Sequence, residues 1–245
     1  MKYAPVLLVL FQLSFGQGVR SGEDVIKHMH DRYVRTAPKT VMFTQKTIEY
    51  QPNGTSKESI WHESVDLPGK LRIRFAPLDS GNGLLFIRDS MFIFRSGKVA
   101  RSQPLIHPII LLAYDSYHLP LAETLRKLKE LKFDLSVIHE DTWENKPVYV
   151  VGAASGDLKS KQFWIDKERL ILLRIIDVVQ PSGVMVETQL SKHKKIGDAW
   201  IETEVKFFRN GTMTMQEHYL DVRFNVPLDE RLFMTENGGR REKNR

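Results

Sequence analysis

Apolar positions along this chain follow two periods, one typical of helices and one typical of strands. Helical spacing covers residues 21–35, where Ser21 and Asp24 have the spacing of a capping box. From residue 40 the period changes to two and predicts strands over 41–50, 59–63, 70–75, 84–87 and 91–94. Helical spacing returns over 109–114 and 120–131, and strands are predicted again over 148–151, 162–165, 170–179, 184–190, 200–207 and 212–223.

Turn signals separate these predicted strands. Gln51-Pro52-Asn53-Gly54 combines a proline, which presets one backbone dihedral, with an Asn-Gly pair that accepts positive φ. Such signals recur about every 12 to 15 residues, which leaves too little chain for parallel crossovers. The pattern therefore predicts one domain, mainly β with some α, built as an antiparallel meander in two blocks with helices between them.

About ten strands in meander order must curl or close, because long flat sheets expose their edges. The segment from Ile109 to Leu112 is apolar nearly all round, which suits a helix lodged inside the curl. The concave face is then either plain core or the wall of a lipid-sized cavity. A one-residue error in strand parity would turn any set of candidate residues to the other face. The candidate wall residues are Leu71, Ile73, Phe75, Phe92, Phe94 and Trp164.

The N-terminus has the layout of a secretory signal peptide. A cationic start at Met1-Lys2-Tyr3 precedes the apolar run from Val6 to Phe11, and Ser14 and Gly16 then supply small residues. The alternative is a buried N-terminal strand. We predict a signal peptide over residues 1–18, export to the bacterial periplasm and, because no second apolar run could span a bilayer, a soluble mature protein.

Composition narrows the function further. The 245 residues include no cysteine, so we expect no disulfide, catalytic thiol or lipid-anchor cysteine. The net charge is +6, of which residues 238–245 carry +3 and Lys2 carries +1. The body is therefore nearly neutral, which argues against nucleic acid as a partner. A basic, disordered tail over 234–245 leaves contact with an anionic membrane surface open.

Two patterns that suggest catalysis have simpler explanations. Ser191 and Lys194 have Ser-x-x-Lys spacing, but that motif needs the start of a helix and here it ends a predicted strand. Glu202 and Glu204 share a predicted strand face with Lys206, which is more typical of an outward, solvated face than of an acid–base pair. We therefore predict no catalytic residues.

No metal site is predicted either. His28 and His30 lie two apart on a predicted helix and point away from each other, whereas helical metal pairs lie three or four apart. The other histidines are scattered, and the acidic residues between Asp134 and Glu144 lack calcium-ligand spacing. We expect neither a metal nor an organic cofactor.

The chain resembles the LolA/LolB/LppX superfamily of bacterial envelope proteins, to which the N-terminal domain of RseB is related. The resemblance covers residues 21–233 of the mature chain, and it is carried by the signal peptide before them, the N-terminal helix, the mid-chain helices and three short motifs. These motifs are Phe43-Thr44-Gln45, the run Trp61-His62-Glu63 continuing to Pro68-Gly69-Lys70-Leu71-Arg72-Ile73, and Phe163-Trp164-Ile165-Asp166.

This resemblance implies an unclosed barrel of about eleven antiparallel strands, capped by helices, that carries or senses acylated molecules. It also implies an arginine near the cavity mouth, but Arg72 and Arg74 lie on the strand face opposite Leu71 and Ile73.

We accordingly predict a half-barrel domain over residues 19–233 that acts as a monomeric, non-enzymatic carrier or sensor of a lipid, acyl chain or lipoprotein. Two alternatives stay open. In the first, the barrel is filled and a surface patch binds an envelope protein. In the second, the chain is an exported hydrolase with an unrecognised site.

Overall fold

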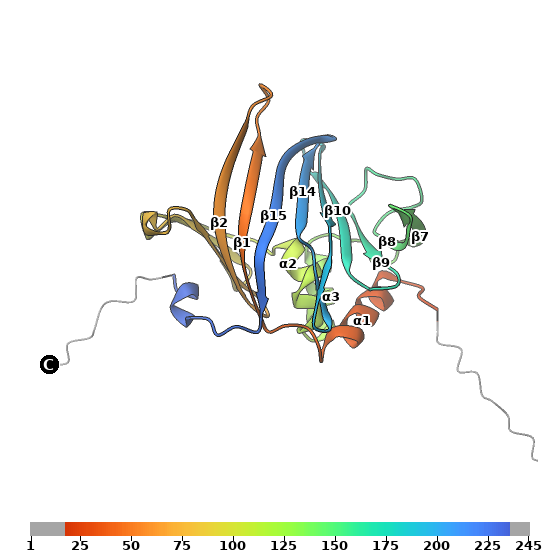
Figure 1. The fold of residues 1–245 in the computed structure, drawn as a ribbon. Coiled ribbons are helices and arrows are strands. Elements are labelled where there is room, and N and C mark those ends of the chain that lie inside the picture. The colour runs from red at the N-terminus through yellow and green to blue at the C-terminus, as the bar shows by residue number, and fades with distance from the viewer. Residues whose placement is uncertain (1–17, 236–245) are drawn as a thin grey trace, which may run out of the picture.

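The computed structural model describes residues 18–235, so the predicted signal peptide falls almost wholly, and the predicted tail largely, outside the described residues. Thirteen strands form one antiparallel sheet in the order β6-β5-β4-β3-β2-β1-β15-β14-β11-β10-β9-β8-β7, and β12 pairs with β13 in a separate ribbon. The sheet curls without closing, which confirms the predicted fold class (Figure 1). Consecutive strands are neighbours almost throughout, and β1 joins the two blocks by pairing with both β2 and β15.

The first block contains β1 (Thr40–Tyr50), β2 (Ser56–Asp66), β3 (Lys70–Phe75), β4 (Gly83–Ile87), β5 (Ser90–Arg95) and β6 (Lys98–Pro104). The second block contains β7 (Ile138–Trp143), β8 (Lys146–Val151), β9 (Gln162–Asp166), β10 (Leu172–Val179), β11 (Val184–Ser191), β14 (Glu204–Arg209) and β15 (Thr212–Phe224). The ribbon consists of β12 (Lys194–Ile196) and β13 (Ala199–Ile201).

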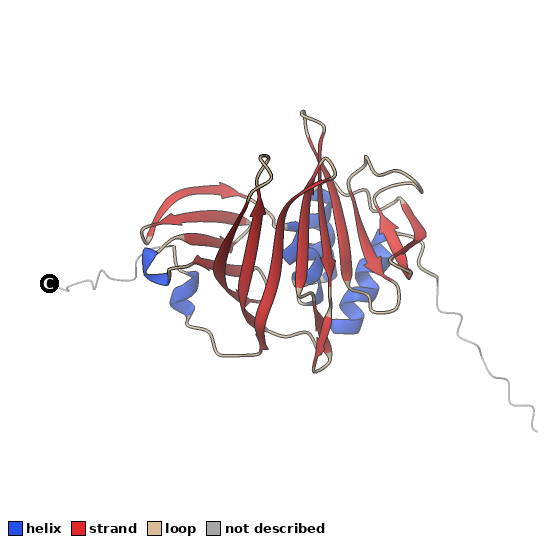
Figure 2. Cartoon of the chain, turned by 45° about the horizontal axis from the view of Figure 1, so that its top comes forward, coloured by secondary structure: helices blue, strands red, loops and turns tan. Residues whose placement is uncertain are grey.

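Three α-helices of the described chain lie on the concave side of the sheet (Figure 2). They are α1 (Gly22–Tyr33), α2 (Pro108–Ala113) and α3 (Leu121–Glu130), and the short 3₁₀ turns are η1 (Leu78–Ser80), η2 (Asp115–Tyr117) and η3 (Glu230–Phe233). The capping box predicted for α1 is confirmed, since the Asp24 amide donates to Ser21 Oγ over 3.2 Å and the Ser21 amide donates to the Asp24 carboxylate. No helix within residues 18–235 is long and apolar enough to cross a membrane.

Helix α2 is the short apolar segment expected inside the curl. Pro108 occupies its first turn, where a missing N–H costs nothing, and Nδ1 of His107 accepts the Ile110 amide. Leu111 and Leu112 are fully buried against the second block of the sheet, whereas Ile110 packs on the first block. The helix therefore separates two apolar clusters on the concave side.

A third apolar cluster lies on the opposite face of the first block. There Leu85 and Phe94 pack against Phe233 of η3, so the C-terminal end of the described chain covers strands β3 to β5 from outside. Both faces of the sheet are consequently buried at this end, and an apolar residue here can point either way.

The number of strands differs from the eleven that the resemblance implied, since the described chain has fifteen. Strands β6 and β7 form the two edges and were missed because their exposed, polar residues do not alternate with apolar ones. The strand predicted over 200–207 is interrupted at Glu202 and Thr203, which separates β13 from β14. This interruption changes which face the flanking residues occupy.

Candidate binding cavity

A small cavity of about 80 Å³ lies between helix α2 and the concave face of the sheet. Strands β1, β2, β3, β14 and β15 supply its walls on one side, and the start and end of α2 close the other. Its apolar lining consists of Phe43, Val65, Leu71, Ile73, Ile109, Ile110 and Phe207. Its polar lining consists of Glu63, His107, Tyr114, Glu217 and Tyr219.

Strand alternation places these residues on one face. On β1, Val41, Phe43, Gln45 and Thr47 are buried in turn, while the intervening residues are more exposed. The ring of Phe43 stacks on that of Tyr219 from the neighbouring strand, with centroids 4.1 Å apart. The wall is therefore rigid on the sheet side, where cross-strand pairs fix the side chains.

Three carboxyl groups are buried in and beside this cavity. Glu63 and Glu217 line it, and Glu202 lies behind Tyr114, whose hydroxyl donates to Glu202 Oε1 over 2.6 Å. Their exposed fractions are only 7%, 3% and 7% for Glu63, Glu202 and Glu217. None of the three forms an ion pair with any described residue, although buried charges are normally paired.

Burial shifts the protonation of these groups. Desolvation raises the pKa of Glu202 to about 7 and that of Glu217 to about 8. It also raises the pKa of Glu63 well above its ordinary value, and the charges of Glu217 and Glu202 add to this effect. Burial lowers the pKa of His107 to about 4, so its imidazole is neutral at pH 7. The cavity lining thus contains no permanent cation.

Glu202 and Glu204 do not share an outward, solvated face, so that prediction is wrong. Both are buried, and the interruption at Thr203 turns them to opposite faces. Glu202 faces α2, whereas Glu204 contacts Lys192 over 2.6 Å and Lys206 over 3.2 Å on the other side. These cations, with Ser191, hold the pKa of Glu204 near 2 despite the opposing effect of burial.

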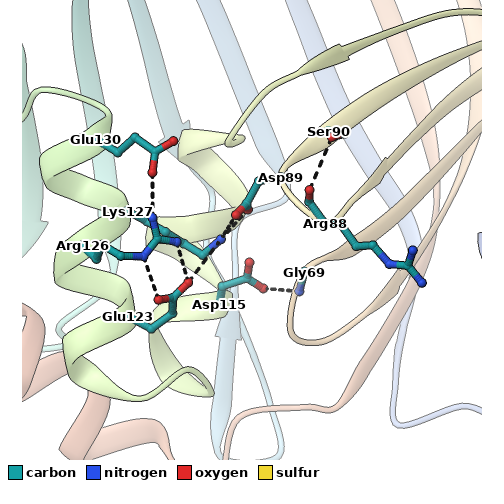
Figure 3. Close-up of polar contacts among 9 residues, drawn as sticks. All are labelled: Gly69, Arg88, Asp89, Ser90, Asp115, Glu123, Arg126, Lys127 and Glu130. Atoms are coloured by element: carbon teal, nitrogen blue, oxygen red, sulfur yellow. Dashed lines mark hydrogen bonds and ion pairs between the residues drawn. The ribbon is translucent and has the colours of Figure 1, made fainter.

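Helices η2 and α3 are fastened to the turns of the first block beside the cavity (Figure 3). Asp115 of η2 accepts the Gly69 amide over 2.8 Å, at the turn between β2 and β3. Lys127 of α3 donates to both oxygens of Asp89, at the turn between β4 and β5. These contacts hold the helical segment that follows α2 against the sheet.

The six residues predicted as cavity walls fall into four groups. Leu71 and Ile73 line the cavity. Phe75 shares their face, but it packs against Trp61 with ring centroids 4.8 Å apart and does not line the cavity. Phe92 and Phe94 belong to the cluster on the opposite face, around Leu85 and Phe233.

Trp164 also lies away from the cavity. Its neighbour Phe163 packs against Phe133 on the helix side, so alternation turns Trp164 to the other face. There the guanidinium of Arg174 lies against two indoles that pack edge to face, 4.7 Å from the ring centroid of Trp164 and 4.3 Å from that of Trp143. Arg174 also pairs with Glu187 over 2.7 Å, so the two buried charges of this cluster neutralise each other.

The buried carboxyls were missed by the sequence analysis. A signal for Glu63 was present, because it alternates with Trp61 and Val65 on one strand face. Glu217 alternates in the same way with Met215 and Tyr219, whereas no local pattern marks Glu202, which lies at the interruption. Within residues 18–235 no three His, Cys, Asp or Glu side chains are grouped so that they could hold a metal ion.

Solved structures of low sequence identity share this fold. One is titled a "putative outer membrane lipoprotein-sorting protein domain" from Vibrio parahaemolyticus; it is 14% identical, with a TM-score of 0.60 over 86% of this chain and 95% of that one. A DUF1329 family protein from Desulfovibrio piger is 15% identical, with a TM-score of 0.57 over 87% and 95% of the two chains. A LolA superfamily protein from Nitrosomonas europaea is 10% identical, with a TM-score of 0.54 over 85% and 97%.

The chain has a LolA-like fold. This confirms the resemblance proposed from the sequence at the level of the fold. Sequence identities of 10–14% support a shared fold and nothing beyond it. No protein-family model and no curated protein sequence matches the chain. The arginine that the resemblance implied does not line the cavity: the guanidinium of Arg72 lies on the opposite face, 4.0 Å from the ring centroid of Phe94.

Proposed function

We propose that this protein is an exported, non-enzymatic binding protein that holds the hydrocarbon part of an amphiphile between α2 and the concave face of the half-barrel. The observation that carries the proposal is the cavity itself, which lies inside the curl and is lined mainly by apolar side chains. The lipoprotein-sorting and LolA-like structures that share the fold support the same role.

Apolar burial would supply the affinity. Each methylene group removed from water contributes about 0.8 kcal/mol. The cavity of about 80 Å³ is smaller than the roughly 300–1,000 Å³ of typical ligand sites, so only the end of a chain fits beside α2 as it stands. A long hydrocarbon chain requires α2 to shift away from Leu71 and Ile73. These are the two residues predicted from the sequence that we propose as walls of the binding site.

A pair of valine variants tests this role. Val65→Trp fills the cavity, whereas Val99→Trp adds the same bulk at an exposed position on edge strand β6. Each protein is purified from its native envelope and bound lipid is extracted and identified by mass spectrometry. Lipid should accompany the wild type and the Val99 variant and be lost from the Val65 variant. Absence of lipid from the wild type, together with no binding of dodecanol, would refute the proposal.

The proposed location is the bacterial periplasm, and it rests on the signal-peptide pattern of residues 1–18. Fractionation of cells that express the full chain should recover a processed protein in the periplasmic fraction. Recovery of unprocessed protein in the cytoplasm would contradict this location without bearing on the cavity.

A second candidate function is an interaction module with a filled interior. The small volume of the cavity favours it, because helices α1 to α3 and their side chains already occupy most of the concave side. In that case a surface patch binds an envelope protein. Crosslinking in intact cells would capture such a partner, while no lipid would be extracted from the purified protein.

A further inference from the structure

The three buried carboxyl groups lack the cation that most other buried carboxyls of the described chain have, with Asp115, which accepts the Gly69 amide, as the exception. Glu187 is buried and pairs with Arg174, and Glu204 is buried and pairs with Lys192 and Lys206. Glu63, Glu202 and Glu217 are equally buried, but no cation among residues 18–235 lies within ion-pair distance of them. Burying a carboxyl group without a partner costs free energy of folding, so the grouping of three such groups beside a cavity requires an explanation.

A second observation points to a missing donor at the same place. Gln45 is fully buried on the cavity face of β1, next to Glu217, and its amide nitrogen donates to Thr47 over 2.8 Å. Its side-chain oxygen has no hydrogen-bond partner among the described residues. An uncharged acceptor and carboxyl oxygens therefore converge beside the cavity, where the Tyr219 hydroxyl donates to Glu217 over 3.4 Å and the Tyr114 hydroxyl donates to Glu202.

Among residues 18–235, the elements around the three carboxyls add no cation. The titratable groups that face the three carboxyls are His107 before α2, Tyr114 at its end, Tyr117 in η2 and Tyr219 in β15. Phenols are neutral at pH 7, and the imidazole of His107 is neutral because burial lowers its pKa to about 4. An anionic head group would meet only carboxyls and neutral groups here.

We propose that the cavity recognises an amphiphile with a primary ammonium head group, which Glu63 and Glu217 bind while its hydrocarbon chain lies against Leu71 and Ile73. This inference rests on the proposed function and deepens it by naming the class of ligand. An ammonium offers three donors and no acceptor, which matches the carboxyl oxygens of Glu63 and Glu217 and the unpartnered side-chain oxygen of Gln45. Its charge replaces the cation that Glu187 and Glu204 have and these carboxyls lack.

Recognition of this kind releases a proton. In the free protein Glu217 is mostly protonated at pH 7, because burial raises its pKa to about 8. An ammonium beside it favours the carboxylate, so the carboxyl proton passes to the buffer as the ion pair forms. Affinity for the amine should consequently increase between pH 6 and pH 8, while affinity for an uncharged ligand should not.

The experiment compares three ligands with the same chain, namely dodecylamine, dodecanol and dodecanoate, by isothermal titration calorimetry at pH 6 and pH 8. The wild type should bind dodecylamine at least tenfold more tightly than dodecanol at pH 8, and dodecanoate most weakly. Repeating the titration in buffers of different ionisation enthalpy should detect a released proton for dodecylamine alone. This readout uses the wild type and does not depend on a variant folding.

Two matched substitutions locate the effect. Glu217→Gln should weaken dodecylamine binding at least tenfold and leave dodecanol binding unchanged. Glu58→Gln, on the same strand as Glu63 but exposed and paired with Lys46, should change neither. Equal affinity of the wild type for dodecylamine and dodecanol, or no proton release, would overturn the inference while the proposed function stands. Failure of all three ligands to bind would overturn both.

Vesicles then distinguish two sources of the ammonium group. The protein is incubated with vesicles of phosphatidylethanolamine or of phosphatidylglycerol, separated from them and analysed for bound lipid. Uptake of phosphatidylethanolamine alone supports the inference and identifies a membrane lipid head group. Uptake of neither lipid, with dodecylamine bound, supports it with a free amphiphilic amine as the ligand. Preferential uptake of the anionic phosphatidylglycerol would contradict it.

Discussion

The hydroxyl of Tyr114 donates a hydrogen bond of 2.6 Å to Oε1 of Glu202. Tyr114 ends helix α2, and Glu202 lies at the interruption between β13 and β14. One buried hydrogen bond therefore joins helix α2 to the segment between β13, which belongs to the separate ribbon, and β14, which belongs to the main sheet. The position of α2, which closes the cavity, depends on a tyrosine and a carboxyl far apart in sequence.

Tyr114→Phe should loosen this connection. The substitution keeps the ring but removes the donor, so the free energy of unfolding should fall by about 1–2 kcal/mol. The pKa of Glu202 should also increase beyond about 7, since the Tyr114 hydroxyl is the main group that lowers it. Urea denaturation measures the first effect, and carboxyl titration by NMR measures the second.

Tyr50→Phe is the matched control. The Tyr50 hydroxyl donates to Gln216 over 3.1 Å at a partly exposed site, where water replaces the lost partner. Its loss of stability should be less than half that of the Tyr114 variant. Equal losses would mean that the bond to Glu202 has no special role in holding α2.

Stability should decrease from pH 6.5 to pH 8.5 because of the buried carboxyls. Burial raises the pKa of Glu202 to about 7 and that of Glu217 to about 8 from an ordinary 4.5, so in this range the folded state binds more protons than the unfolded state. Each group contributes at most about 1.4 kcal/mol per pH unit. His107 and His193, whose pKa burial lowers to about 4, act in the opposite direction only below about 6.5.

The test is denaturation at several pH values for the wild type, Glu202→Gln and Glu217→Gln. The glutamine variants should lose less stability over this range than the wild type does, since an amide does not titrate. Glu58→Gln should follow the wild-type curve because Glu58 is exposed. Parallel curves for all four proteins would show that the two carboxyls are ionised in the folded state at pH 6.5.

Much of the fold follows from local patterns. Strict alternation in Leu71, Ile73 and Phe75 predicts β3 and its buried face, and the capping box at Ser21 predicts the start of α1. The edge strands β6 and β7 could not be predicted in this way. Their partners lie on one side only and their residues stay exposed, so no apolar period develops.

The cavity was harder to predict, for two physical reasons. Alternation groups Phe92 with Phe94, but it does not say which face is concave, and η3 buries the outer face as well. Alternation also fails where a strand is interrupted, as between Glu202 and Glu204. The buried carboxyls could not be predicted either, because their burial depends on residues that the fold brings together from distant strands and from α2.

Lys127 and Arg126 are neighbours on α3 with different expected contributions to stability. Lys127 donates to Asp89 with only 11% of its side chain exposed, whereas Arg126 pairs with Glu123 and Glu130 with 53% exposed (Figure 3). Lys127→Met should lower the free energy of unfolding by about 1–2 kcal/mol. Arg126→Met should change it much less than Lys127→Met does, because exposed pairs are screened by water.

Hydrogen exchange locates the effect of the Lys127 substitution. If the contact with Asp89 holds α3 against the turn between β4 and β5, the amides of α3 should exchange faster in Lys127→Met than in Arg126→Met. Uniform acceleration across the whole sheet would instead indicate a global loss of stability. Unchanged exchange in α3 would show that Asp115 and the apolar contacts of α3 suffice.

The ion pair between Arg174 and Glu187 should be strongly coupled, because both side chains are buried and the Arg174 guanidinium contacts the indoles of both Trp143 and Trp164. Arg174→Met removes the partner of a buried carboxylate and should cost about 3–5 kcal/mol. Combining Arg174→Met with Glu187→Leu removes both charges, so the double variant should be less destabilised than the sum of the two single variants.

Urea denaturation of the wild type, both single variants and the double variant forms the cycle that measures this coupling. The exposed pair of Lys46 and Glu58, 2.8 Å apart, is the control cycle and should give about 0–1 kcal/mol. A coupling energy in the buried cycle no larger than in the control would mean that the two indoles and water compensate for the lost partner. Ligand binding should be unchanged in the folded double variant, since this cluster lies on the face away from the cavity.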